Sequence, residues 1–173
     1  LRGGRPEKPP PVLCLIGRVV PIKDVKTFIR AMRRVINQLP DAEGWIAGPE
    51  DEDPAYAEEC HNLAESLGVD DRVKFLGFQK VENLMPKIGL TILSSISEAL
   101  PLVILEGYAA GVPTISTDVG SCRQLIEGLD EEGFLHQIDR TNLLDGKPLI
   151  YLREQNTVTI GPADNPGMVL AVH

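Results

Sequence analysis

Short apolar runs alternate with amphipathic segments along most of this chain, and this alternation restricts the possible folds more than any other feature. The run Val12–Ile16 is apolar throughout, as in a strand that is buried on both faces. Over residues 24–38 the apolar side chains instead recur at helical spacing. Strands joined by helices require parallel crossovers, so the sequence predicts a Rossmann-like, doubly wound, mostly parallel α/β sheet.

The segments that follow continue this pattern. Pro54 suits the first turn of a second long helix, and Gly68 suits its end. Ser121 suits the cap of a last helix. Further strands are expected at residues 44–48, 73–76, 90–93 and 112–117, and further helices near residues 82–87, 102–110 and 122–127.

Composition divides the chain into three parts. Residues 1–11 are rich in Pro, Gly and charge and are interpreted as a linker that another segment precedes. The α/β domain is expected at residues 12–129. Residues 130–173 form an atypical β-rich tail, with strand-like segments at residues 149–152, 157–160 and 168–172. The tail is interpreted as a variant of the domain, an added β-hairpin or sequence of foreign origin, and the pattern does not separate these three.

Charge and cysteine usage exclude several classes of function. Seventeen basic against 25 acidic residues give a net charge of −8, which argues against nucleic-acid partners and anionic membrane surfaces. No apolar run approaches the ~20 residues of a membrane span, so no membrane insertion is expected. Cys14, Cys60 and Cys122 fit no disulfide or zinc spacing, which predicts a cytoplasmic protein without a metal. All three are interpreted as packing residues.

Polar residues gather where the predicted strands end, and ligands of doubly wound sheets bind beyond the carboxyl ends of the strands. After the first strand, Gly17 has no side chain at the turn, while Arg18 and Lys23 provide the charge that a diphosphate needs. The alternative interpretation is two solvated cations beside the start of a helix.

Two glutamates follow the fourth strand. Glu98 lies in the loop, and Glu106 lies eight residues later on the next helix. If that helix begins near Leu102, the free N–H groups of residues 100–103 face an anion. One carboxylate would then hold sugar hydroxyls and the other ribose hydroxyls. In the alternative interpretation Glu98 caps the helix and Glu106 is an exposed helix residue.

These glutamates have seven residues between them and are followed by the residues GYAAGVPTI. This segment resembles the donor-site signature of the retaining GT-B glycosyltransferases of family four, the glycosyl transferases group one. Gly17 and Arg18 with Lys23 resemble the phosphate-binding loop of that family, and residues 73–78 resemble its strand and loop near the nucleobase. The resemblance covers roughly residues 12–129 and implies one half of a GT-B fold. Ala99, Leu100 and Pro101 depart from it, because the family commonly has glycines after its first glutamate.

The resemblance also implies roles for individual residues. Arg18 and Lys23 would clamp the diphosphate, Glu98 would bind the transferred sugar and Glu106 the ribose. Arg18, Lys23 and Glu98 would be the catalytic residues. The donor-binding residues implied in this way are Gly17, Arg18, Lys23, Gly77, Phe78, Glu98, Leu100, Pro101, Leu102 and Glu106.

A reaction is implied as well: retaining transfer from a UDP-sugar such as UDP-glucose to a growing polysaccharide, without a metal. The acceptor site would belong to a missing N-terminal domain, so the isolated chain is expected to be inactive. Two alternatives remain open, a nucleotide-sugar epimerase of GT-B architecture and a non-catalytic nucleotide-binding α/β module. A dinucleotide-dependent dehydrogenase is disfavoured, because no GxGxxG follows the first strand.

Overall fold

A computed structural model describes residues 10–127, 143–144, 147–153 and 168–172. Strands and helices alternate through the first of these ranges, as the sequence predicts. The elements there are β1 (Val12–Ile16), η1 (Pro21–Lys23), α1 (Val25–Gln38), β2 (Glu43–Ala47), α2 (Pro54–Ser66), β3 (Val73–Gly77), α3 (Val81–Leu84), η2 (Met85–Lys87), β4 (Leu90–Leu93), α4 (Leu102–Ala110), β5 (Thr114–Ser116) and α5 (Cys122–Glu127).

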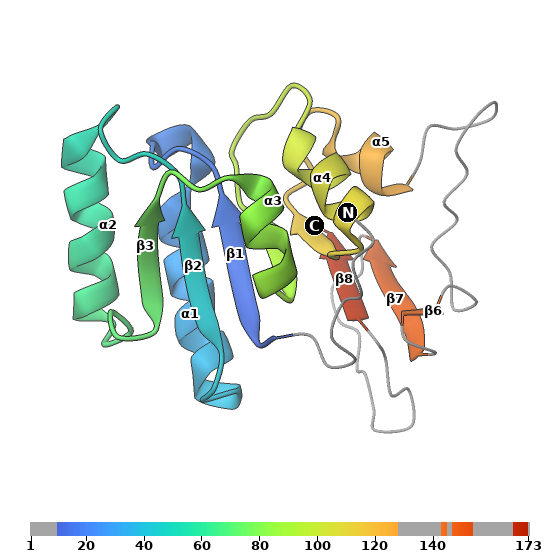
Figure 1. Cartoon of the computed structure of the whole chain (residues 1–173), viewed down its shortest axis with the longest axis horizontal. Helices are drawn as coiled ribbons and strands as arrows, with labels where there is room; N and C mark the ends of the chain where they lie inside the picture. Colours follow the sequence, from blue (N-terminus) through green and yellow to red (C-terminus); the bar gives the residue numbers. More distant parts are fainter. Residues whose placement is uncertain (1–9, 128–142, 145–146, 154–167, 173) are drawn as a thin grey trace.

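The strands β1 to β5 form one parallel sheet in the order β3-β2-β1-β4-β5. The chain proceeds outward from β1 through β2 to β3 (Figure 1). It then returns to place β4 on the other side of β1. The direction of winding therefore reverses between β1 and β4, which is the position where doubly wound sheets bind ligands. The predicted fold class is confirmed.

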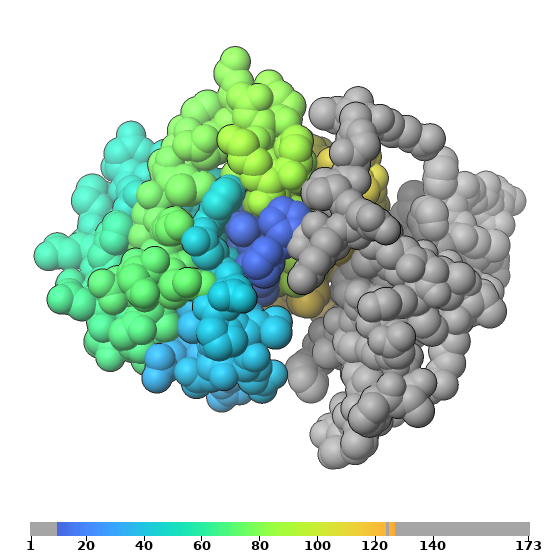
Figure 2. Space-filling view, turned by 60° about the horizontal axis from the view of Figure 1, so that its bottom comes forward, coloured from blue at the N-terminus to red at the C-terminus, as the bar shows by residue number. Residues whose placement is uncertain are grey.

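Helices cover both faces of this sheet. On one face α1 and α2 pack against the strands around Phe28, Ile29 and Met32 of α1, which are at most 1% exposed. On the other face α3, η2 and α4 pack around Leu84 and Ile88. Figure 2 brings the amino-terminal edge of the sheet forward and shows the start of the described chain in dark blue. The carboxyl edge, where the loops of interest lie, is on the opposite side.

Some element boundaries differ from the expected ones for local reasons. The helix expected at residues 82–87 is divided into α3 and η2, because Pro86 has no N–H to continue the α-helical ladder. The expected strand at residues 112–117 is shorter, since the N–H of Val112 bonds to the carbonyl of Gly107 at 2.8 Å and closes the end of α4. Asp24 caps α1 from a left-handed conformation, with φ of 45°.

The described part of the tail is built from strands. β7 (Lys147–Arg153) is antiparallel to β6 (Leu143–Leu144) and parallel to β8 (Met168–Val172). The strands expected at residues 149–152 and 168–172 are therefore confirmed, and they pair in parallel rather than as a hairpin. The segment 157–160 and most of the expected linker lie outside the described residues. The division into a linker, a domain of residues 12–129 and a tail stays a prediction.

The three cysteines pack in the interior, as expected. Cys14, Cys60 and Cys122 are free thiols with no exposed surface. Burial raises the pKa of Cys14 to about 12 and that of Cys60 to about 11, and it also raises the pKa of Cys122. All three are protonated at neutral pH, so none has the thiolate that nucleophilic catalysis requires.

A close approach of two backbones joins the loops after β1 and β2. A Cβ at Gly48 would overlap the carbonyl oxygen of Gly17. The N–H of Gly17 donates to the carbonyl of Ala47 at 3.0 Å, and the N–H of Val19 donates to the carbonyl of Pro49 at 2.9 Å. A Cβ at Gly17 itself would only touch the flexible Lys23 side chain at 3.6 Å. The steric requirement for glycine in this turn therefore lies at Gly48, which the sequence analysis did not single out.

We expect Gly48→Ala to lower the free energy of unfolding by ~1–3 kcal/mol, because overpacking at a backbone contact forces the two loops apart. Gly17→Ala is the matched control and should cost less, since its Cβ finds ordinary van der Waals space. Urea denaturation followed by circular dichroism measures both variants. Equal losses of stability would contradict this account of the turn.

Candidate functional site

The reversal of the sheet brings the loop after β1 against the loop after β4. Lys23 Nζ donates to Glu98 Oε1, although the two residues are 75 positions apart. Their side chains are only 19% and 11% exposed. The hydroxyl of Ser94 donates to the carbonyls of Lys23 and Asp24 at 3.1 and 3.0 Å and joins the same two loops. Two of the predicted catalytic residues are thus in direct contact.

Glu98 does not cap the helix that follows it. Its Oε1 accepts from the Ser95 hydroxyl at 2.6 Å as well as from Lys23. Pro101 occupies the cap position of α4, and no side chain bonds to the first turn. The capping interpretation of Glu98 is therefore wrong. In the first turn of α4 the N–H of Ile104 donates to the carbonyl of Pro101 at 3.1 Å, whereas the first N–H groups of a helix generally have no i−4 partner.

A third loop, after β5, supports the backbone around Glu98. Gly120 has φ of 55°, and a Cβ there would overlap the carbonyl oxygen of Glu98. The hydroxyl of Ser121 donates to the carbonyl of Ala99 at 2.7 Å, so Ser121 joins two loops in addition to preceding α5. Thr117 Oγ1 donates to the carbonyl of Ser95 at 2.6 Å. Neither Gly120 nor Thr117 was a predicted site residue, because both act on a loop that is distant in sequence.

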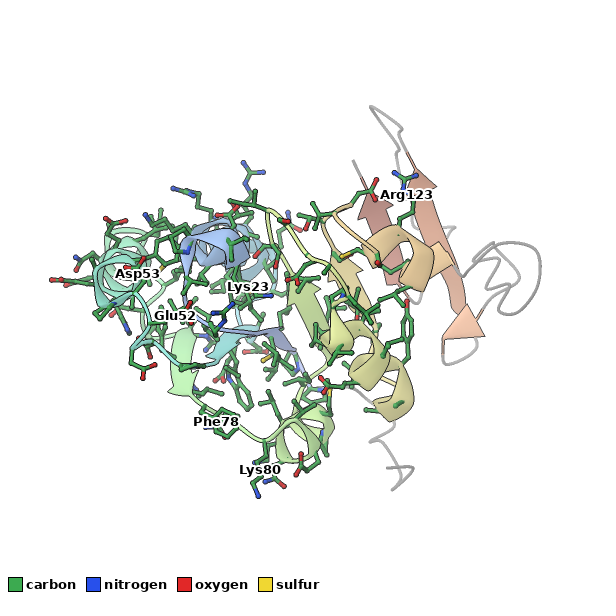
Figure 3. The ribbon with its side chains drawn as sticks, turned by 90° about the horizontal axis from the view of Figure 1, so that it is seen from above. Lys23, Glu52, Asp53, Phe78, Lys80 and Arg123 are labelled. Atoms are coloured by element: carbon green, nitrogen blue, oxygen red, sulfur yellow. The ribbon has the colours of Figure 1, made fainter. Side chains whose placement is uncertain are left out.

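Arg18 lies in the loop after β1 and forms an ion pair with Glu52 of the loop after β2. Its Nη1 donates to both oxygens of Glu52 at 2.6 and 2.5 Å, and the two side chains are 51% and 50% exposed. An exposed pair of this kind contributes only ~0–1 kcal/mol, so an incoming phosphate could displace Glu52. Figure 3 looks down on the carboxyl ends of the strands and shows Lys23 and Glu52 there.

The remaining predicted residues lie around this centre without contacting it. Gly77 has φ of 62°, a conformation that favours glycine, and Phe78 after it is 77% exposed. Glu106 is exposed one turn into α4, and its side chain has no ion pair or hydrogen bond to another residue of the described chain. Leu100 and Leu102 are 54% and 59% exposed. Pro101 between them is buried.

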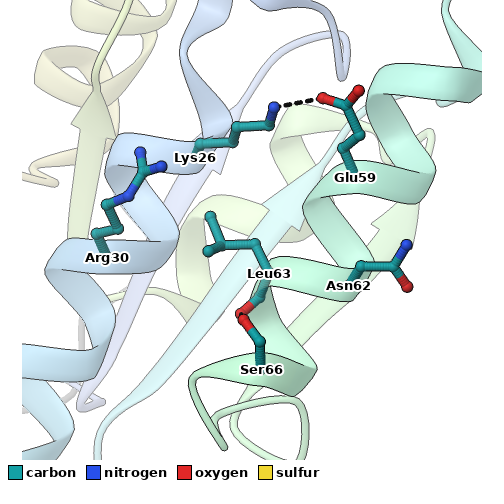
Figure 4. A pocket seen from close by; sticks show the side chains of 6 residues that line it. All are labelled: Lys26, Arg30, Glu59, Asn62, Leu63 and Ser66. Carbon is teal, nitrogen blue, oxygen red and sulfur yellow. Dashed lines mark hydrogen bonds and ion pairs between the residues drawn. The ribbon is translucent and has the colours of Figure 1, made fainter.

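An open groove of about 460 Å³ lies elsewhere, between α1 and α2 (Figure 4). Lys26 forms an ion pair with Glu59 across it. None of the predicted donor-site residues lines this groove, so it is a separate surface feature. Its lining residues are Lys26, Arg30, Glu59, Asn62, Leu63 and Ser66.

The described residues contain neither a metal-binding cluster nor a membrane-spanning helix. Within this part of the chain no three His, Cys, Asp or Glu side chains are grouped so that they could hold a metal ion. None of the described helices has the length and apolar content needed to cross a membrane.

Comparison with known proteins identifies the family. Residues 2–141 match the family described as glycosyl transferases group 1. The chain belongs to this family. It is 32% identical over 140 residues to the lipopolysaccharide core biosynthesis glycosyltransferase LpsE of Rhizobium meliloti, covering 75% of this chain and 39% of LpsE. It is also 37% identical over 120 residues to an exopolysaccharide phosphotransferase of Streptomyces coelicolor, covering 68% of this chain and 12% of that protein.

Solved structures of glycosyltransferases have the same fold. The Anabaena protein HepE in complex with UDP and glucose superimposes with a TM-score of 0.61 at 28% identity, over 67% of this chain and 32% of HepE. HepE in complex with UDP-glucose gives a TM-score of 0.63. The sheet and its helices are therefore a GT-B glycosyltransferase domain. The chain spans about a third of the length of LpsE and HepE and a smaller part of the Streptomyces protein.

Proposed function

We propose that this glycosyl transferases group 1 domain binds a UDP-sugar at the carboxyl ends of β1 and β4. The observation that carries the proposal is the partly buried Lys23–Glu98 pair at the reversal of the sheet, with Arg18 in the same loop. The pair provides a cation for phosphate beside a carboxylate for hydroxyl groups, which are the two kinds of group that a nucleotide-sugar presents. Switch points of doubly wound sheets are general ligand sites, which also supports it.

The proposed reaction is glycosyl transfer with retention. Arg18 and Lys23 would neutralise the charge that develops on the diphosphate as it leaves, and such fixed charges lower the barrier most where water is scarce. Lys23, at 19% exposed, is better shielded than Arg18. Glu98 would orient the transferred sugar, Glu106 the ribose, and Gly77 with Phe78 the base. No metal takes part in the proposed chemistry.

The donor and the pathway are proposed from relatives. HepE was crystallised with UDP-glucose, which makes UDP-glucose the first donor to test. The segment STDVGSCRQLIEG at residues 116–128 resembles the Pel exopolysaccharide glycosyltransferase PelF. We therefore propose a polysaccharide acceptor, bound by an N-terminal domain that lies outside this chain, and a cytoplasmic location. The match covers only 32% of HepE, which is consistent with such a second domain.

The first prediction concerns the two cations. Arg18→Ala or Lys23→Ala should weaken UDP binding much more than uridine binding, because each charge-assisted hydrogen bond to phosphate is worth ~1.5–3 kcal/mol. Isothermal titration calorimetry with both ligands measures the difference. Arg33→Ala, which removes an exposed cation from α1, should leave both affinities unchanged. A similar loss for UDP and uridine would reject the assignment of the cations to the diphosphate.

A second prediction separates the glutamates. Glu106→Ala should weaken UDP itself, because the ribose loses an acceptor. Glu98→Ala should leave the affinity for UDP nearly unchanged and remove the extra affinity that the sugar of UDP-glucose provides. The ratio of the two dissociation constants is measured for each variant, with exposed Glu58→Ala on α2 as the control. The assignment fails if Glu98→Ala lowers only the melting temperature.

A third prediction concerns activity of the isolated chain. It should bind donor but transfer no sugar at a meaningful rate, because a single open half-site does not hold donor and acceptor together. Holding two reactants in place lowers the reaction barrier by up to about 7–11 kcal/mol. Incubation with UDP-glucose and a polysaccharide acceptor, beside a full-length relative, provides the comparison. Turnover comparable to that relative would show that the missing half is unnecessary.

A further inference from the structure

The two oxygens of the Glu98 carboxylate have different surroundings. Oε1 accepts from both Lys23 Nζ and the Ser95 hydroxyl, the latter at 2.6 Å. For Oε2 no hydrogen-bond donor is found within the described chain. The Glu98 side chain is 11% exposed, and no buried side-chain oxygen of the described residues lacks a partner, so Oε2 is accessible from outside. One oxygen is thus held by the protein, and the other is left as an acceptor.

Ser95 is well suited to fix this arrangement. It is 1% exposed and immediately follows the buried Ser94 at the end of β4. Its backbone carbonyl accepts from Thr117 Oγ1 at 2.6 Å, which anchors Ser95 to the loop after β5. A buried hydroxyl with a fixed backbone has few alternative partners, so its proton holds Glu98 in one rotamer.

We propose that Ser95 is a positioning residue, which acts through Glu98 by binding Oε1 and presenting Oε2 to the hydroxyl groups of the donor sugar. This inference rests on the proposed function, since it assigns to Ser95 part of the sugar-dependent affinity. Lys23 cannot provide the same control alone, because its ammonium on a long chain must also serve the phosphate. When phosphate draws Lys23 away, the hydrogen bond from Ser95 keeps the carboxylate in place.

Neighbouring Ser94 offers a matched control. It is also buried, but its hydroxyl donates to the backbone carbonyls of Lys23 and Asp24 and does not contact Glu98. Ser94→Ala and Ser95→Ala each remove one hydroxyl group, from neighbouring positions of the same loop. Only the Ser95 change should alter discrimination between UDP-glucose and UDP.

The experiment measures the ratio of dissociation constants for UDP and UDP-glucose in a double-mutant cycle of the 173-residue chain. Ser95→Ala should reduce this ratio by a factor of about 3–10 and leave the affinity for UDP within about twofold, as for loss of one hydrogen bond. In a Glu98→Ala background the same change should have almost no further effect, because the carboxylate through which Ser95 acts is absent. Ser94→Ala should leave the ratio unchanged.

Different failures have different meanings. A wild-type chain that binds UDP and UDP-glucose equally would overturn the proposed function and this inference with it. A wild-type chain that discriminates, together with Ser95→Ala that discriminates equally well, would overturn the role of Ser95 alone. Additive effects of Ser95→Ala and Glu98→Ala would also overturn it. Melting temperatures check folding, and Ser95→Cys, which retains a weak donor of similar size, replaces Ser95→Ala if the latter does not fold.

Discussion

The parallel pairing of β1 with β4 is the contact on which the rest of the site depends. Leu13, Cys14 and Leu15 pair with Leu90, Thr91 and Ile92, although β2 and β3 intervene in the chain. Because parallel strands end at the same edge, this pairing places the loop of Lys23 against the loop of Glu98. Two of the three predicted catalytic residues, Lys23 and Glu98, come into contact through this pairing.

Backbone contacts then make these loops stiff. Gly48 allows the loops after β1 and β2 to touch, and Gly120 allows the loop after β5 to touch the backbone of Glu98. Buried hydroxyls of Ser94, Ser95 and Thr117 hold the adjoining segments. Side chains in a site must be held closely to the productive geometry, and a framework of backbone contacts provides that better than long side chains do. The polar residues of this edge therefore form a connected network.

The charges at this edge are paired within the chain, and the two cations differ in how strongly they are held. Arg18 with Glu52 is about half exposed, whereas Lys23 with Glu98 is largely shielded. Water screens the attraction between Arg18 and Glu52, whereas the attraction between Lys23 and Glu98 is stronger because less water surrounds it. In an acidic chain of net charge −8, both carboxylates keep a cation oriented at the site. An anionic ligand would exchange more readily with Glu52 than with Glu98.

The amino-acid sequence by itself determined the elements of this protein and the type of its sheet. Apolar spacing indicated β1 and α1 closely, because burial imposes a period that is visible within a few residues. The resemblance of the segments around Arg18 and Glu98 to one family was likewise readable locally, and the family is confirmed. Only the tertiary structure decided the strand order, the Lys23–Glu98 contact and the engagement of Arg18 by Glu52. It also decided the contacts of Ser95, Gly48 and Gly120, because each depends on the three-dimensional position of a partner atom, which no local period in the sequence encodes.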